Sequence, residues 1–128
     1  MKEVWERRSE DVLWSFFIGI NDIGATFDNG KHPDDPAFLD KVYSSYFEII
    51  EELYWDYSAR TFLLLNVPDT TRTPYYLAVL NEEERRCVHT AVVGANERLG
   101  EKAREFIGSH EGVSEVFPLP YVSVTYVV

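Results

Sequence analysis

Gly19, Asn21 and Asp22 follow a short apolar segment and could together support acyl transfer. A glycine lets a ligand approach the backbone closely, and the neutral amide of Asn21 can donate a hydrogen bond to an oxygen that becomes negative during a reaction. Donors of this kind form oxyanion holes, in which removal of one donor typically costs about 10²–10³ in rate. The alternative is that the three residues only form a turn with local side-chain hydrogen bonds.

Nucleophiles and bases are harder to find in this sequence. Ser15 lies inside an apolar segment without the glycines of a nucleophile elbow, so we expect it to be a packing residue. Cys87 and His89 are two positions apart on a predicted helix and should face different directions. We expect Cys87 to be a half-buried thiol, and His32, His89 and His110 to lie on the surface or in loops. We assign no metal ligands from the sequence.

Strand-like and helical segments alternate along the chain. Short, nearly continuous apolar runs are typical of buried parallel strands, and apolar residues spaced three and four apart predict amphipathic helices. In chain order, the predicted segments are a strand at 12–18, a helix at 34–57, a strand at 61–67, a helix at 81–108 and a weaker strand at 113–117. This alternation predicts an α/β domain with parallel strands joined by right-handed crossovers.

Asp34 and Asp35 before Pro36 predict the start of the first helix, and Asn81 with Glu84 predicts a capping box at the start of the second. The apolar residues that predict the buried face of the first helix are Leu39, Val42, Tyr43, Tyr46, Ile49, Ile50, Leu53 and Tyr57, and those of the second are Val88, Ala91, Val92, Ala95, Leu99, Ala103 and Phe106.

Two segments that we expect to be loops follow the first two strands. They are residues 19–24, continued by 27–36, and residues 67–74, which overlap a longer loop at 69–80. Because ligands of parallel α/β sheets bind beyond the carboxyl ends of the strands, these loops are where chemistry is expected.

The composition fits one acidic globular domain. The chain has 128 residues, is 45% hydrophobic and carries a net charge of −10. This charge opposes binding to nucleic acid, because phosphate contacts need clustered Lys and Arg. No apolar run approaches the roughly 18–20 residues that cross a bilayer, so we expect no membrane partner. Five of the first eight residues are charged, and this stretch lacks the apolar segment of a signal peptide.

Several of these stretches together resemble one family of enzymes. Residues 17–24, which contain Gly19-Ile20-Asn21-Asp22, are similar to the third conserved block of the SGNH (GDSL) hydrolases. Residues 59–68 and the following Arg72-Thr73-Pro74 resemble the acetylesterase branch known as carbohydrate esterase family sixteen, and Asn96 and Leu99 match an Asn-x-x-Leu pattern on its next helix. The resemblance covers most of the chain.

The resemblance implies a fold, an activity and site residues. The fold would be a flavodoxin-like, three-layer α/β/α sandwich with a parallel sheet, of which residues 1–128 form a single partial domain. The activity would be hydrolysis of a small ester or acetylated saccharide through serine acyl transfer, without a cofactor. Asn21 would bind the oxyanion, while Gly19 keeps the loop open and Asp22 braces it. Candidate substrate-binding residues are Asn66, Arg72 and Tyr75, with Tyr76 beside them.

Other roles are open for one of these residues and for the whole chain. Arg72 could instead hydrogen-bond backbone carbonyls of its own loop. As an alternative function, the chain could be a non-catalytic α/β module that binds a ligand or partner through the same loops. It could also be an unstable fragment, because unpaired sheet edges favour association. The resemblance implies secretion for longer relatives, and the sequence does not specify an oligomeric state.

The family's nucleophile and base have no counterparts in this sequence. The serine of the family lies in a Gly-Asp-Ser block, and the basic histidine lies in an Asp-x-x-His block. The sequence contains no Gly-Asp-Ser, and none of its three histidines has an aspartate three residues earlier. We therefore expect the chain to be catalytically incomplete.

The purified chain is expected to hydrolyse a small acetyl ester such as 4-nitrophenyl acetate at no more than a weak residual rate. Without a nucleophile, an oxyanion donor and binding alone leave only a small fraction of the catalysis. The release of 4-nitrophenolate measures this rate. Robust turnover that is abolished by Asn21→Ala would contradict the prediction.

Overall fold

The computed structural model describes residues 12–28, 30–113 and 125–127. In chain order, its elements are β1 (Leu13–Phe16), α2 (Ile20–Asp28), α3 (Pro36–Tyr57), β2 (Thr61–Leu65), the 3₁₀ helix η2 (Thr70–Arg72), α4 (Pro74–Val79), α5 (Glu82–Ser109) and β3 (Thr125–Val127). The α/β class expected from the sequence is confirmed. Within the described ranges, no helix is both long and apolar enough to cross a membrane.

The strands form one sheet in the order β1-β2-β3. β1 and β2 are parallel, as expected, with Trp14 opposite Phe62. β3 is antiparallel to β2, with Leu64 opposite Tyr126, so the sheet is mixed and not wholly parallel. The third strand was expected at 113–117; Val113 lies outside any strand, and 114–117 are outside the described residues. The strand beside β2 is instead β3, from a later segment, and it runs in the opposite direction to β2.

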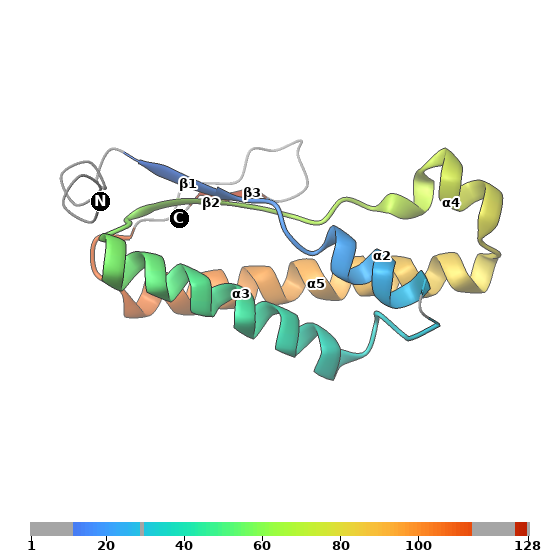
Figure 1. Cartoon of the computed structure of the whole chain (residues 1–128), viewed down its shortest axis with the longest axis horizontal. Coiled ribbons are helices and arrows are strands. Elements are labelled where there is room, and N and C mark those ends of the chain that lie inside the picture. Colours follow the sequence, from blue (N-terminus) through green and yellow to red (C-terminus); the bar gives the residue numbers. More distant parts are fainter. Residues whose placement is uncertain (1–11, 29, 114–124, 128) are drawn as a thin grey trace.

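α3 and α5 cover the same face of the sheet (Figure 1). α3 is the crossover helix between the parallel strands β1 and β2, whereas α5 follows β2 and precedes the antiparallel strand β3. The described residues therefore form two layers, and the third layer of the predicted sandwich is not among them. On the uncovered side of β1, the side chain of Leu13 is exposed, and so is that of Phe17 just beyond the strand.

Both long helices begin at the caps that the sequence predicts. Asp35 accepts a hydrogen bond of 3.0 Å from the N–H of Ala37, directly before Pro36. Asn81 and Glu84 form a reciprocal capping box, in which each side chain accepts from the other residue's backbone N–H at 2.9 and 2.8 Å. These caps fix where α3 and α5 start, and the buried stripe of each helix sets the face that packs on the sheet.

The core lies between the sheet and the helix pair. Every predicted core residue of α5 is buried, namely Val88, Ala91, Val92, Ala95, Leu99, Ala103 and Phe106. The alanines of this face are small and leave room for α3 and the sheet. On α3, Ile49 was also predicted to belong to the core, but it is exposed because the buried stripe passes through Tyr46 and Ile50 on either side of it.

The segment after β1 was expected to be a loop, and this expectation is wrong. Residues Ile20–Asp28 form the helix α2. Ile20, Ile23 and Phe27 recur at helical spacing; Ile23 is buried, and the other two pack against the core. Glycine, Asn and Asp suggested a turn, but this apolar spacing was the stronger signal. The predicted loop at 69–80 likewise contains η2 and α4.

A cluster of aromatic and charged side chains closes the end of the sheet where β2 begins. The hydroxyl of Tyr54 donates to the carbonyl of Glu111 at 2.9 Å, and the guanidinium of Arg60 lies 4.0 Å from the centre of the Tyr54 ring. The imidazole of His110 stacks on Phe106 with ring centres 4.0 Å apart. These contacts join the ends of α3 and α5 to the start of β2.

Leu99→Ala is expected to lower the free energy of unfolding by about 2–5 kcal/mol, because it leaves a cavity in the core. Leu99 is 0% exposed, whereas Leu77 on α4 is 58% exposed and provides a matched control. We expect Leu77→Ala to change stability by no more than about 0.5 kcal/mol. Urea unfolding followed by circular dichroism measures both, and equal effects would contradict the described core.

Candidate functional site

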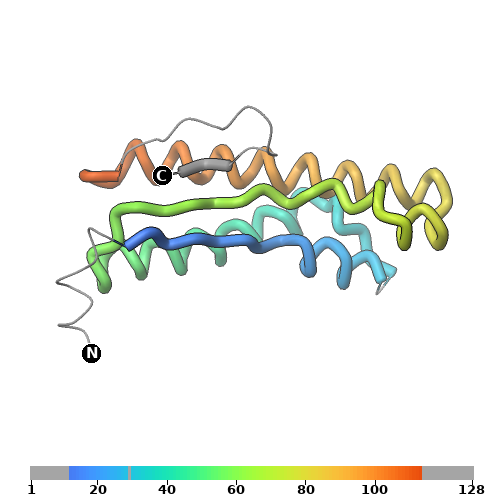
Figure 2. The backbone as a smooth tube through the Cα atoms, turned by 90° about the horizontal axis from the view of Figure 1, so that it is seen from above, coloured from blue at the N-terminus to red at the C-terminus, as the bar shows by residue number. Residues whose placement is uncertain are grey.

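The two segments that carry the candidate residues lie at the same end of the sheet. Figure 2 shows β1 and β2 side by side, leading to α2 and to the η2–α4 segment at that end. This follows from the parallel pairing of the two strands, whose carboxyl ends point the same way. The topology thus gathers the segments where ligand binding was expected.

Gly19 has a conformation and a position that exclude a side chain. Its φ of +111° lies in a region that other residues rarely adopt. A Cβ added to Gly19 would lie 2.7 Å from Cγ2 of Val67 and 3.0 Å from the hydroxyl of Tyr43. The glycine therefore lets the chain leave β1 in close contact with the chain that leaves β2.

Asn96 of α5 holds Val67 in this position. The N–H of Val67 donates to Oδ1 of Asn96 at 2.8 Å, and Nδ2 of Asn96 donates to the carbonyl of Val67 at 3.0 Å. The side-chain amide thus satisfies both backbone groups of one residue where the strand pairing has ended. The Asn-x-x-Leu pattern noted in the sequence has this structural role for its asparagine, while its leucine, Leu99, is in the core.

Asn21 and Asp22 lie in the first turn of α2, directly after Gly19. The side chain of Asn21 is exposed and makes no hydrogen bond to another described residue, so its amide can donate to a ligand. The first turn of a helix also leaves backbone N–H groups without intrahelical acceptors. Asn21 and Asp22 line a cavity of about 310 Å³, together with Lys31 and Phe38.

The hydroxyl of Tyr43 is buried behind Gly19. Burial, with a smaller contribution from the negative charge of Asp22, raises the pKa of Tyr43 to about 12. The hydroxyl therefore keeps its proton at neutral pH, and it has no hydrogen-bond partner among the described residues. The side chain behind Gly19 is therefore uncharged, and the negative charge that acts on it is that of Asp22.

The candidate substrate-binding residues do not all gather around Asn21. Asn66 follows β2, is 8% exposed and lines a different cavity, of about 500 Å³, beside Asn96. Arg72 and Tyr75 are exposed, at the end of η2 and on α4. Tyr76 is the aromatic residue nearer to α2, since a Cβ added to Gly24 would lie 3.4 Å from its hydroxyl.

The sequence predictions for Ser15 and Cys87 have different outcomes. Ser15 was expected to pack in a buried strand, but its side chain is exposed, because α3 and α5 cover only the other face of β1. Cys87 is half-buried, as predicted. Burial, and the hydrogen bond that its thiol donates to Asp34 at 3.2 Å, raise the pKa of Cys87 to about 11. Little of this thiol is ionised at neutral pH, which makes it a poor nucleophile.

His89 is exposed, as predicted, and pairs with a carboxylate that follows β2. Its Nδ1 lies 3.2 Å from Oδ2 of Asp69, whose other oxygen accepts hydrogen bonds from the backbone and hydroxyl of Thr71. Partial burial alone would raise the pKa of Asp69, but these bonds outweigh it and hold the pKa below its usual value. This pair was not predicted from the sequence, because its members are twenty positions apart.

His110 was expected at the surface or in a loop; it lies in a bend directly after α5, but its side chain is only 8% exposed. Its Nε2 lies 2.8 Å from a carboxylate oxygen of Glu51, and its Nδ1 lies 2.8 Å from the carbonyl of Phe106. The aromatic residues around the end of α5 enclose the ring. This end of the molecule is opposite to α2 and Asn21 (Figure 1), so His110 is not positioned to act as a base beside Asn21.

The chain is similar to an acetylesterase from Thermothelomyces thermophilus. The two are 31% identical over 106 residues, which are 83% of this chain. The chain spans about a third of the length of this relative, since the matched residues are 34% of it. No protein-family profile matches the chain, and no solved structure matches it.

Gly19→Ala is expected to lower the free energy of unfolding by more than about 1 kcal/mol, because of its positive φ and the contact with Val67. Gly108→Ala is the matched control. A Cβ at Gly108, near the end of α5, would meet no atom within 4 Å, so alanine should leave stability unchanged or raise it by up to about 1 kcal/mol. Chemical unfolding of both variants tests this, and a neutral Gly19→Ala would contradict the described contact.

Proposed function

We propose that this chain forms the oxyanion-binding part of a carboxylic-ester hydrolase of the SGNH type, in the carbohydrate acetylesterase branch. The strongest support for this proposal is the 31% sequence identity to an acetylesterase over 106 residues. The resemblance of residues 17–24 to a conserved block of that family supports it further, because that block contains Asn21.

Asn21 stabilises the transition state of acyl transfer in this proposal. When a nucleophile adds to an ester carbonyl, negative charge develops on the carbonyl oxygen, and Nδ2 of Asn21 donates a hydrogen bond to it. A neutral amide suits this role, since it donates without exchanging a proton. The backbone N–H groups of the first turn of α2 add positive potential at the same place. Gly19 brings this turn next to Val67, and Asp22 braces it.

The substrate of this site is a small ester, and we favour an acetylated saccharide. The exposed ring of Tyr75 provides a flat apolar surface beside the η2–α4 segment, and a sugar ring can pack on such a surface. Arg72 is exposed on the same segment and can donate hydrogen bonds to a saccharide or to a product carboxylate. Asn66 is buried and precedes this segment in the sequence, and it would hold the start of the segment in place.

The nucleophile and the base come from outside this chain in our proposal. Ser15 lies within β1, Cys87 is mostly protonated, and His110 lies at the opposite end of the sheet. The acetylesterase relative is about three times as long as the matched stretch and has room for both groups. The exposed apolar side chains of Leu13 and Phe17 are consistent with a further layer that covers this face in a longer protein.

A chimeric enzyme tests this assignment. The matched segment of this chain replaces the corresponding segment of the Thermothelomyces acetylesterase, which supplies its own remaining residues. Asn21→Ala in this chimera is expected to lower kcat by about 10²–10³, with a small change in KM, because the lost hydrogen bond acts mainly in the transition state. Initial rates with an acetylated oligosaccharide measure both constants.

Ser44→Ala is the control for this experiment, since Ser44 is exposed on α3, away from Asn21. We expect it to leave kcat unchanged. Equal rates for the chimera and its Asn21→Ala variant would contradict the oxyanion role. Saturable binding of the acetylated oligosaccharide by a folded chimera that hydrolyses nothing would favour the alternative, a module that binds without catalysis.

A further inference from the structure

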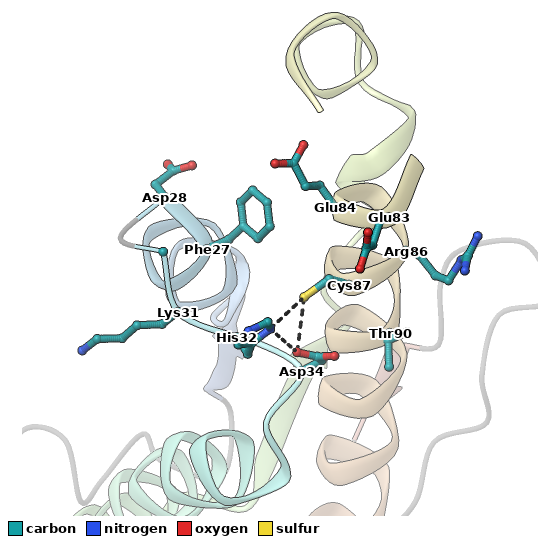
Figure 3. Close-up of a pocket in the computed structure, with 11 residues that line it drawn as sticks. Phe27, Asp28, Lys31, His32, Asp34, Glu83, Glu84, Arg86, Cys87 and Thr90 are labelled. Carbon is teal, nitrogen blue, oxygen red and sulfur yellow. Dashed lines mark hydrogen bonds and ion pairs between the residues drawn. The ribbon is translucent and has the colours of Figure 1, made fainter. Parts of the chain in front are cut away.

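A cavity on the side of α5 brings together three side chains that commonly bind metal ions. The cavity has a volume of about 740 Å³ and lies between α5 and the connection from α2 to α3. His32 and Asp34 come from the connection, and Cys87 comes from the second turn of α5 (Figure 3). The sequence analysis missed this group because more than fifty positions separate Cys87 from the other two residues.

The distances between the three ligand atoms are close to those that a bound metal ion requires. Sγ of Cys87 is 3.2 Å from Oδ1 of Asp34 and 4.0 Å from Nδ1 of His32, and the last two atoms are 3.8 Å apart. Usual zinc–sulfur, zinc–nitrogen and zinc–oxygen bonds in a tetrahedron place such atoms about 3.3–3.6 Å apart. The imidazole of His32 is 85% exposed and can turn to close the remaining gap.

We propose that His32, Asp34 and Cys87 form a binding site for a divalent transition-metal ion, of which Zn²⁺ is the best match. One sulfur, one imidazole nitrogen and one carboxylate oxygen suit zinc, whereas Mg²⁺ and Ca²⁺ prefer oxygen ligands alone. Three protein ligands leave a fourth position, which faces the cavity and takes a water molecule. This site is independent of the proposed oxyanion role of Asn21.

Two features of the surroundings favour a cation at this place. Carboxylates outnumber basic groups around the cavity, with Asp28, Asp34, Glu83 and Glu84 against Lys31 and Arg86. The connection that carries two of the ligands is also well anchored: Pro33 is fully buried, and the N–H of Asp35 donates to the carbonyl of His32 at 3.2 Å. The ligands are therefore held close together before an ion arrives, which lowers the entropy cost of binding.

Binding replaces the hydrogen bond between the thiol and Asp34 with bonds to the metal. The thiol of Cys87 gives its proton to the solvent, and the resulting thiolate and the carboxylate of Asp34 both coordinate the ion. The bound ion then joins two parts of the chain, α5 and the connection between α2 and α3. Without the ion, the hydrogen bond between Cys87 and Asp34 joins them at this place. No oxidation or reduction takes place.

Cobalt(II) is a suitable probe, because thiolate coordination gives it a charge-transfer band in the near ultraviolet. The 128-residue chain is freed of metal with a chelator under reducing conditions and titrated with CoCl₂. We expect the band to saturate at one equivalent and to disappear when ZnCl₂ is added, but not when MgCl₂ or CaCl₂ is added. ZnCl₂ should also raise the Tm of the chain.

Variants of the three ligands separate a built site from incidental binding. Cys87→Ser should abolish the band, and His32→Asn and Asp34→Asn should each weaken cobalt binding at least about tenfold. His89→Asn is the matched control, because His89 lies on the same helix but contacts Asp69, and it should leave binding unchanged. Circular dichroism checks that each variant is folded.

The proposal is wrong if the unmodified chain gives no band or if Cys87→Ser retains it. It is also wrong if neither His32→Asn nor Asp34→Asn weakens binding, because the cysteine would then bind cobalt without the other two ligands.

Discussion

The close approach of two chain segments, where β1 and β2 end, underlies the rest of this structure. Gly19 contacts Val67 so closely that no side chain fits between them, and Asn96 fixes Val67 through both of its backbone groups. Because Asn96 belongs to α5, this one long helix sets the positions of the segments that follow both strands. α2 begins one residue after this contact, so the position of Asn21 depends on the packing of Gly19, Val67 and Asn96 and not on contacts of its own side chain.

Predictions from residue patterns within a single helix or strand agreed best with the structure. The two long helices, their caps and the whole buried face of α5 could be predicted, because helical spacing and capping are local properties. The same logic failed for α2, where glycine and polar residues outweighed the spacing of Ile20 and Ile23 in our interpretation. The strands β1 and β2 and their parallel pairing also followed from local runs and their order.

Features that depend on distant contacts could not be predicted in this way. The place and direction of β3 depend on its pairing with β2, and the burial of His110 depends on aromatic residues of both α3 and α5. The pairing of Asp69 with His89, and the meeting of Cys87 with Asp34, join residues that no spacing rule connects. The role of Asn21 stays a prediction from the sequence, whereas its exposure and its place in the first turn of α2 come from the fold.

The aromatic cluster around Tyr54 and His110 has a consequence for how this sequence can vary. It fastens the helices to the start of β2, at the end of the sheet opposite to α2 and α4. The segments around α4 carry exposed side chains and make few buried contacts. Substitutions of these exposed side chains should therefore cost little stability. In the function that we propose, the surface offered to a saccharide can change on α4 while the aromatic cluster at the other end of the sheet keeps its contacts.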